Sequence, residues 1–442
     1  MKRLIAVVGV AAIACSLMLP PAAAQEVVSA NASSLTIGGY IDFDAVLRGA
    51  EIFLIGPHDE HFVNTDLAIE LTIDMTDDVG AFIQIRDDWV EYADFTDIET
   101  ELSFPLFGTV MPGDPWSWDD YQLEIEQAYI DVNEFLVPEL SVRVGIQNLA
   151  WDLRGNGDEF LLNLNENHYY GSTWEAGGWK ATYDAEPLML EGFAATIWET
   201  LGAGSDAALY GARGVYPFDY DMGKGQLGVV VFDNDSVQTY SADFGVDYWV
   251  NDDLEVYGEG AWQFGEWNDG LLGTIDAAGW GAYGGVMYTA SEYEYQPSID
   301  VSYWYLTGDD IPTDTEAKSF LSMEDVDTFA ILEENHYGWD FDSNYSAVKA
   351  CASVKPADDV TLGLKAGWFK LVEPLPASEE DDLGIEVDAS LTWQYSENLA
   401  FTGLVAYLFG ADVIKELVEV VGVSDEAEDS GMLATFSTVL VF

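Results

Sequence analysis

The stretch Gly431–Phe442, GMLATFSTVLVF, alternates between two kinds of side chain along its whole length. In an extended chain Phe436, Leu440 and Phe442 fall on one side, whereas Ser437 falls on the other. Because side chains of a β-strand repeat every two residues, this pattern predicts a strand with one clearly apolar face. A strand must pair with other strands in a sheet, and the rest of the chain contains the candidate partner strands.

The same alternation recurs upstream, for example in Leu35–Arg48, Val63–Met75 and Leu383–Tyr395. In the last of these, apolar residues occupy the odd positions, and acids such as Glu386 and Asp388 stand between them. A helix would scatter these apolar residues around its circumference, so the periodicity excludes helix there. Any single strand of this kind also fits a water-soluble sandwich with one wet face. The long series favours a membrane barrel.

The chain contains about 18 such segments, each near the roughly 10 residues that a tilted membrane strand needs. Short and long connections alternate between them, as in outer-membrane barrels with short periplasmic turns and long extracellular loops. The tight connections are 76–80, 251–253 and 396–398, and the long ones are roughly 90–120, 148–169, 308–345 and 410–430. The predicted fold is therefore an all-β transmembrane antiparallel barrel of about 18 strands.

The first 24 residues have the form of a secretory signal peptide. Lys2 and Arg3 precede an apolar run over 4–19, and small residues lead to an expected cleavage after Ala24. We therefore expect a signal peptide at 1–24 and a barrel at 25–442, exported to the outer membrane of a Gram-negative (diderm) bacterium. Once the signal peptide is removed, Cys351 is the only cysteine, so no internal disulfide can form.

The aromatic ending of Gly431–Phe442 resembles the terminal strand by which outer-membrane barrels are recognised and closed. That resemblance implies the barrel-assembly machinery as a partner. An open sheet edge cannot sit in hydrocarbon, so the last strand is expected to pair with the first. The oligomeric state is left open by the sequence.

The charge is extreme, with 15 basic and 80 acidic residues and a net charge of −65. Nucleic acid is excluded as a partner, because contacts to phosphate need Lys and Arg. Hydrophobic residues still make up 49% of the chain, so it can fold. Salt adaptation is an alternative reason for the acidity. In a wet pore, rings of acidic side chains favour cations and repel polyanions.

Charged and polar residues on the non-lipid side of the predicted strands are expected to line a water-filled pore. A barrel of this strand number is too wide for side chains to fill, so water should enter it. Trp304 also falls on this polar side, where it either stacks on a sugar ring or fills space. The predicted pore-lining residues are Asp42, Asp44, Arg48, Asp66, Glu70, Asp74, Arg86, Arg143, Gln147, Asp243, Asp247, Glu255, Glu259, Asp300, Glu386 and Asp388.

Several short motifs carry a resemblance to a known family. Glu126–Asp131 followed by Leu140–Gln147, and then Asn148–Gly155, resemble its QAYxD strand, its LRxGRQ-type strand and the loop after it. Thr307–Asp310 with later Phe320 and His336–Gly338 resembles its GDD…F…HYG pattern. The chain is thus similar to the alginate-export family of outer-membrane porins. The resemblance implies an 18-stranded channel, and export of an anionic polysaccharide as one alternative.

One position departs from the family pattern. Where the family's strand carries Arg between Gly and Gln, this chain has Ile146. Strict alternation directs Ile146 to lipid, whereas the family comparison puts that position near the bore. With few basic residues in the strands, we expect passive diffusion of small solutes, either cations or neutral saccharides. An outer-membrane enzyme or a surface scaffold with a blocked lumen are rival functions.

Metal and catalytic motifs are weak. Asp340, Asp342 and Asn344 have the spacing of a calcium loop but lack the Gly and distal Glu of an EF-hand. His58 and His61 flank two carboxylates within an expected loop. No nucleophile elbow, P-loop or CxxC pair occurs. The sequence therefore predicts a non-enzymatic protein with no metal site, no cofactor and no catalytic residues.

Overall fold

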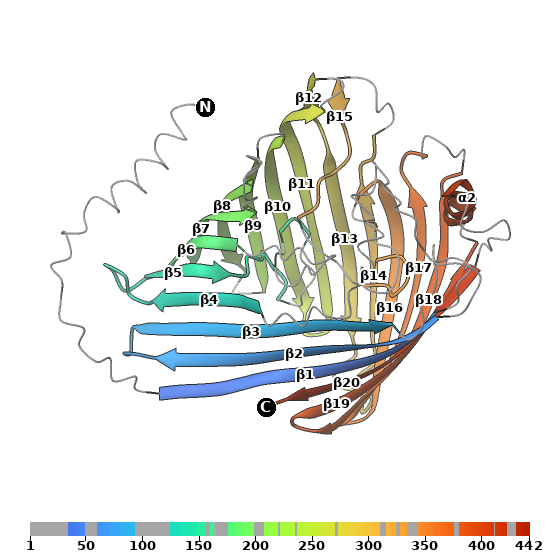
Figure 1. Ribbon diagram of the computed structural model, residues 1–442, viewed down its shortest axis with the longest axis horizontal. Helices are drawn as coiled ribbons and strands as arrows, with labels where there is room; N and C mark the ends of the chain where they lie inside the picture. Colours follow the sequence, from blue (N-terminus) through green and yellow to red (C-terminus); the bar gives the residue numbers. More distant parts are fainter. Residues whose placement is uncertain are drawn as a thin grey trace.

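The computed structural model shows an antiparallel β-barrel (Figure 1). It describes residues 34–48, 60–92, 124–155, 160–162, 164, 176–198, 207–219, 222–234, 237–269, 273–309, 315–323, 328–333, 341, 343–374, 380–410, 412–421 and 430–442. The expected signal peptide at 1–24, the His58 motif, Asp340 and Asp342 lie outside the described residues. The aromatic ending, Phe442, lies within them.

Eighteen of the described strands form the wall of the barrel. They are β1 Ser34–Arg48, β2 Glu60–Asp74, β3 Val79–Tyr92, β4 Glu124–Val132, β5 Leu140–Gln147, β6 Ala176–Ala185, β7 Leu188–Trp198, β8 Ala207–Phe218, β9 Gly223–Asp233, β10 Val237–Asn251, β11 Leu254–Asp269, β13 Trp280–Thr289, β14 Ser298–Leu306, β16 Tyr345–Ala357, β17 Val360–Leu371, β18 Asp382–Ser396, β19 Leu399–Phe409 and β20 Ser430–Val441. Two short strands, β12 Gly273–Ala277 and β15 Glu316–Ala317, extend beyond β11 at one end of the barrel.

Each wall strand pairs antiparallel with the next, and β20 pairs with β1 to close the sheet. The closing ladder runs from Tyr40 opposite Val441 to Arg48 opposite Leu433. Beyond it, the Gly39 N–H donates to the Phe442 carbonyl at 3.1 Å. Closure leaves no wall strand with an unpaired edge, as a strand structure in hydrocarbon requires. The predicted fold and strand number are confirmed.

The two faces of the wall differ as the alternation predicts. On β10, Phe244 and Val246 face outward and are 59% and 42% exposed, whereas Asp243 and Asp247 face inward and are 3% and 2% exposed. β11 repeats this arrangement, with Trp262 68% exposed on its outer face. Apolar side chains that stay exposed around a closed sheet form a surface suited to lipid rather than water.

The inside of the barrel contains chain as well as side chains. The described residues of three segments, 149–155, 160–162 with 164, and 328–333, contact side chains that point inward from the wall. These segments and the wall share one buried apolar cluster, which includes Trp151, Ile331 and Trp304, and Phe320 of the segment 315–323 also belongs to it. Chain that packs against the inner surface therefore occupies part of the barrel interior.

The loop expected at 410–430 contains a helix, α2 Asp412–Val421, at the rim of the barrel in Figure 1. Val413 and Ile414 are fully buried, as are Leu408 of β19 and Leu433 of β20. Alternation does not predict this helix, which lies within the stretch expected to be a loop. Within the described ranges, the structure has no helix of the length and apolarity needed to span a membrane.

Candidate functional site

Charged side chains on the inner faces of β1 to β4 are joined in one network. Arg86 of β3 bonds to Asp66 of β2, with Nη2 to Oδ2 at 2.8 Å, and its Nη1 donates to Glu126 of β4 at 3.1 Å. The Tyr40 hydroxyl donates to Asp66 at 2.9 Å. Charge-assisted bonds of this kind fix side-chain positions strongly. The predicted residues Asp66 and Arg86 are therefore rigid parts of the wall.

The other predicted residues of β1 and β2 have varied surroundings. Asp42 accepts a hydrogen bond from the Ser437 hydroxyl of β20 at 3.0 Å, across the closing seam. Glu70 accepts one from Gln84 at 3.3 Å. Asp74 is exposed at the end of β2 and accepts a hydrogen bond from Ser34. The remaining predicted residues here are Asp44, half-buried on β1, and Arg48, whose backbone pairs with that of Glu60.

The inner face of β5 carries Arg143 and Gln147. Arg143 makes a two-pronged contact with Asp131 of β4, with Nε at 2.7 Å and Nη2 at 3.0 Å from its oxygens. Its guanidinium also lies 3.8 Å from the ring centroid of Tyr129. Gln147 is 1% exposed and donates to the Gly178 carbonyl at 3.4 Å. Ile146 lies between these inward positions, on the same side as the exposed Val144, which supports the lipid-facing interpretation.

Four buried carboxylates stand side by side on β10 and β11. Asp243 and Asp247 come from β10, and Glu255 and Glu259 come from β11, each at most 4% exposed. Gln226 donates to Asp243 at 2.8 Å. One oxygen each of Asp243, Asp247 and Glu259 makes no hydrogen bond with any described residue. This part of the inner wall therefore holds more negative charge than its protein partners neutralise.

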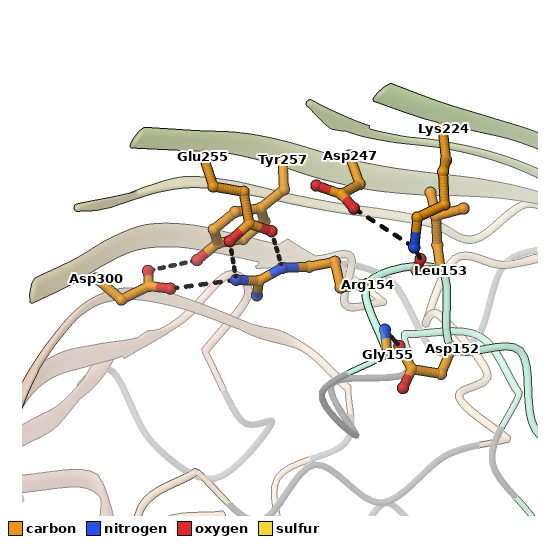
Figure 2. Close-up of polar contacts among 9 residues, drawn as sticks. All are labelled: Asp152, Leu153, Arg154, Gly155, Lys224, Asp247, Glu255, Tyr257 and Asp300. Carbon is orange, nitrogen blue, oxygen red and sulfur yellow. Dashed lines mark hydrogen bonds and ion pairs between the residues drawn. The ribbon is translucent and has the colours of Figure 1, made fainter. Parts of the chain in front are cut away.

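Arg154 binds this wall from an inward-folded segment (Figure 2). Its Nε donates to Glu255 at 2.8 Å, its Nη2 lies 3.4 Å from Asp300 of β14, and its guanidinium stacks 3.4 Å from the centroid of Tyr257. The Tyr257 hydroxyl donates to Asp300 as well. With a side chain 5% exposed, Arg154 is buried against the wall carboxylates and neutralises part of their charge.

The segment around Arg154 is held by several further contacts. The Lys224 ammonium donates to the Leu153 carbonyl at 2.9 Å and lies 3.7 Å from Asp247 (Figure 2). The Trp151 indole N–H donates to Glu191 of β7 at 2.8 Å. The segment can lie this close because the wall beneath it carries glycines. A Cβ at Gly228 would meet the Trp151 ring at 2.6 Å.

A second inward segment, residues 328–333, is here called the inner strap. Glu386 of β18 accepts hydrogen bonds from two strap N–H groups, that of Ile331 at 2.7 Å and that of Leu332 at 3.0 Å. Asp388 accepts a third from the Ala330 N–H at 3.2 Å. Glu386 and Asp388 are 0% and 1% exposed. These two predicted residues therefore anchor backbone inside the barrel.

The strap is also fixed by a cation from β16. The Lys349 ammonium pairs with Glu333, which accepts a further bond from the Tyr345 hydroxyl at 3.1 Å. The same ammonium lies 4.0 Å from the centroid of Trp304. Trp304 is 4% exposed and stacks on Tyr283 with centroids 4.3 Å apart. Trp304 thus lies on the inner face as predicted, and it fills space rather than offering a ring to a sugar.

Arg154 lies in the stretch 148–155 that resembles the family's loop with an Asp and an Arg, but its partners are not predicted from the sequence. Three further cations were not predicted as site residues: Lys224, Lys349, and Arg213 of β8, which pairs with Glu191 at 3.4 Å. All three lie on inner faces that alternation does identify. Alternation was therefore a usable signal for those three. No group of His, Cys, Asp or Glu among the described residues has the geometry of a metal site. Of the proposed calcium loop, only Asn344 is described, and its side chain bonds to the backbone of Glu373.

Comparison with known proteins agrees with this architecture. The family model described as alginate export matches residues 237–379, about a third of the chain, and confirms the resemblance seen in the motifs. No curated protein matches the sequence.

Solved structures of Pseudomonas aeruginosa channels match over nearly the whole chain. OccK2 (OpdF) in complex with glucuronate has a TM-score of 0.58 at 9% identity, covering 92% of this chain and 98% of that one. OpdK with vanillate has a TM-score of 0.55 at 10% identity, with the same coverage. At such low identity the likeness establishes the fold alone.

The closed sheet with its apolar exterior, together with these matches, agrees with location in a Gram-negative outer membrane. The chain is an outer-membrane β-barrel of porin architecture whose residues 237–379 match the alginate-export family.

Proposed function

We propose that this barrel is a porin through which small solutes diffuse passively, with a preference for cations over anions. The observation that carries the proposal is the group of four carboxylates, Asp243, Asp247, Glu255 and Glu259, on the inner faces of β10 and β11. Arg154 and Lys224 are the cations that contact them among the described residues. Fixed negative charge in excess along a water path raises the local concentration of cations.

The predicted pore-lining set supports this proposal in three different roles. Asp66, Arg86, Arg143 and Glu255 are paired and hold the wall or its inner segments in shape. Glu386 and Asp388 hold the inner strap and so determine the bore rather than the ionic field. Asp243, Asp247 and Glu259 each keep one buried carboxylate oxygen without a hydrogen bond to a described residue, and in the proposal their charge acts on passing ions through its field.

Neutral saccharides are the second class of solute in the proposal, because a passive pore does not require a charged solute. Export of an anionic polysaccharide, which the family match suggests, is the alternative. The charge of this chain argues against it, since a polyanion would meet the carboxylates of β10 and β11 along with a net charge of −65.

A planar bilayer experiment tests the proposal. The purified protein is reconstituted under a KCl gradient, and the expected result is a steady ohmic current whose reversal potential indicates cation preference. The triple variant Asp243→Asn, Asp247→Asn, Glu259→Gln should move that potential toward the unselective value. Glu292→Gln, in the exposed turn before β14, is the control and should leave it unchanged.

Other outcomes would support the rivals. Anion preference in the wild-type channel would favour polysaccharide export. Absence of current from protein that migrates as a folded barrel would favour a surface scaffold or an outer-membrane enzyme. A wild-type selectivity that the triple variant does not alter would show that these carboxylates do not face the ion path.

A further inference from the structure

A groove opens on the lipid-facing surface of the barrel where β18, β19 and β20 lie side by side. Its volume is about 370 Å³, and its lining is almost entirely apolar. Gly403 of β19 forms the floor, because the register places this residue between Leu391 of β18 and Phe436 of β20. A Cβ at Gly403 would have no atom within 4 Å, so the missing side chain leaves a gap in the outer surface.

Aromatic rings border the groove toward the short turn between β18 and β19. The Phe401 ring lies between those of Trp393 and Phe436, at centroid distances of 5.8 and 6.2 Å. Trp393 and Phe436 are 39% and 49% exposed, so both rings are open to the surroundings of the wall. In outer-membrane barrels short turns are periplasmic, and aromatic girdles lie at the boundary between headgroups and acyl chains. The groove therefore runs from that boundary toward the middle of the membrane.

The boundary end of the groove carries a carboxylate. The Trp393 indole N–H donates to Asp359 at 3.1 Å, which holds that carboxylate beside the exposed ring. Asp358 precedes it in the turn between β16 and β17, and Lys355 is the one cation of the stretch 355–360. A carboxylate next to an indole ring attracts an organic ammonium through both ionic and cation–π contacts. The same carboxylate repels an anionic headgroup.

We propose that this groove binds one phospholipid of the surrounding membrane whose headgroup ends in an ammonium, as in phosphatidylethanolamine. One acyl chain lies over Gly403 between Leu391 and Phe436, and the ammonium contacts Asp359 and the face of Trp393. The backbones that flank Gly403 are two strand spacings apart, about 10 Å, which leaves room for one extended hydrocarbon chain between the two side chains. The inference concerns the outer surface of the wall and goes beyond the proposed function of the lumen.

Native mass spectrometry of the detergent-purified protein tests the groove. Phosphatidylethanolamine and phosphatidylglycerol with identical acyl chains are supplied in equal amounts, and the wild type is expected to retain the ethanolamine lipid in preference. Gly403→Leu fills the groove and should weaken binding of that lipid about tenfold, because its acyl chain loses contact with the groove walls. Ala366→Leu adds the same side chain to the exposed outer face of β17 and should bind lipid as the wild type does.

A second pair of variants tests the headgroup contact. Asp358→Asn combined with Asp359→Asn removes the negative charge and keeps an acceptor for Trp393. It should lower the preference for the ethanolamine lipid about threefold, as the strength of exposed ion pairs predicts. Asp77→Asn combined with Asp78→Asn makes the same change in the short turn between β2 and β3, and should leave the preference unchanged.

These readouts do not depend on ion conduction, so they separate the lipid site from the proposed function. Equal retention of the two lipids, or ethanolamine lipid binding that survives Gly403→Leu, would overturn the site. An oligomer of this chain that Gly403→Leu dissociates, with lipid binding unchanged, would assign the groove to contact between copies and also overturn it. A wild-type barrel that retains the lipid but carries no current would refute the proposed function and leave the lipid site standing.

Discussion

Glu386 offers the sharpest test of how the inner strap is held. Its carboxylate lies fully inside the protein and accepts the N–H groups of Ile331 and Leu332 at 2.7 and 3.0 Å. Glu386→Ala removes both acceptors. A buried N–H left without a partner costs about 1–3 kcal/mol, so the docked strap should lose about 2–6 kcal/mol relative to a displaced one.

Other contacts would oppose displacement of the strap. Lys349 pairs with Glu333, the Lys365 ammonium donates to the Thr328 carbonyl at 2.6 Å, and Phe329 packs edge-on against Phe369. The strap of the alanine variant should therefore fluctuate around its position rather than leave the lumen. Population of displaced states would widen the bore at intervals.

Single-channel recording checks this expectation. Glu386→Ala should show a higher mean conductance and more open-channel noise than the wild type, and Glu386→Gln, which keeps one oxygen acceptor, should fall between them. Glu397→Ala is the matched control, because it makes the same change in the exposed turn between β18 and β19. Conductance and noise of Glu386→Ala that equal those of the wild type would refute the reasoning.

Three further variants test other parts of the structure. Arg154→Ala should increase cation preference, because Glu255 and Asp300 lose their shared cation; an unchanged reversal potential would contradict this. Ile146→Arg should leave selectivity unchanged while lowering stability by up to about 4 kcal/mol, since the side chain faces lipid, and weakened cation preference would place it at the bore instead. Ile414→Ala should lower stability by about 2–5 kcal/mol and hence lower the unfolding temperature in detergent. Asp412→Ala, on the exposed side of α2, is the control and should not. Equal unfolding temperatures for the two variants would show that α2 does not pack on the barrel.

The wall of the barrel was predictable from the sequence because its signal is local. Alternation in stretches such as Leu383–Tyr395 depends only on which side of a strand contacts lipid, and each strand repeats that information. The strand positions, the closure by Gly431–Phe442 and the inward direction of Trp304 follow from it. The repeated pattern also explains why the strand number could be counted.

The roles of the inner residues were not predictable in the same way. Alternation predicted that Glu386 faces inward, but its partners lie 55 and 54 residues away in a segment with no periodic pattern. The sequence therefore predicted that Glu386 lines the pore and attracts ions, whereas in the structure its carboxylate accepts hydrogen bonds from the backbone of the inner strap. Likewise, the inward fold of Arg154 depends on carboxylates 101 and 146 residues distant. Such pairings are set by tertiary packing.

The ladder between β1 and β20 has a consequence for the order of events in biogenesis. Ser34–Arg48 precedes the other strands in the chain, yet one edge of its Tyr40–Arg48 part is matched only by Leu433–Val441. Until then a long apolar ribbon is available to any other chain in the periplasm. That edge must therefore be kept from other strands during the interval between synthesis of the first strand and of the last.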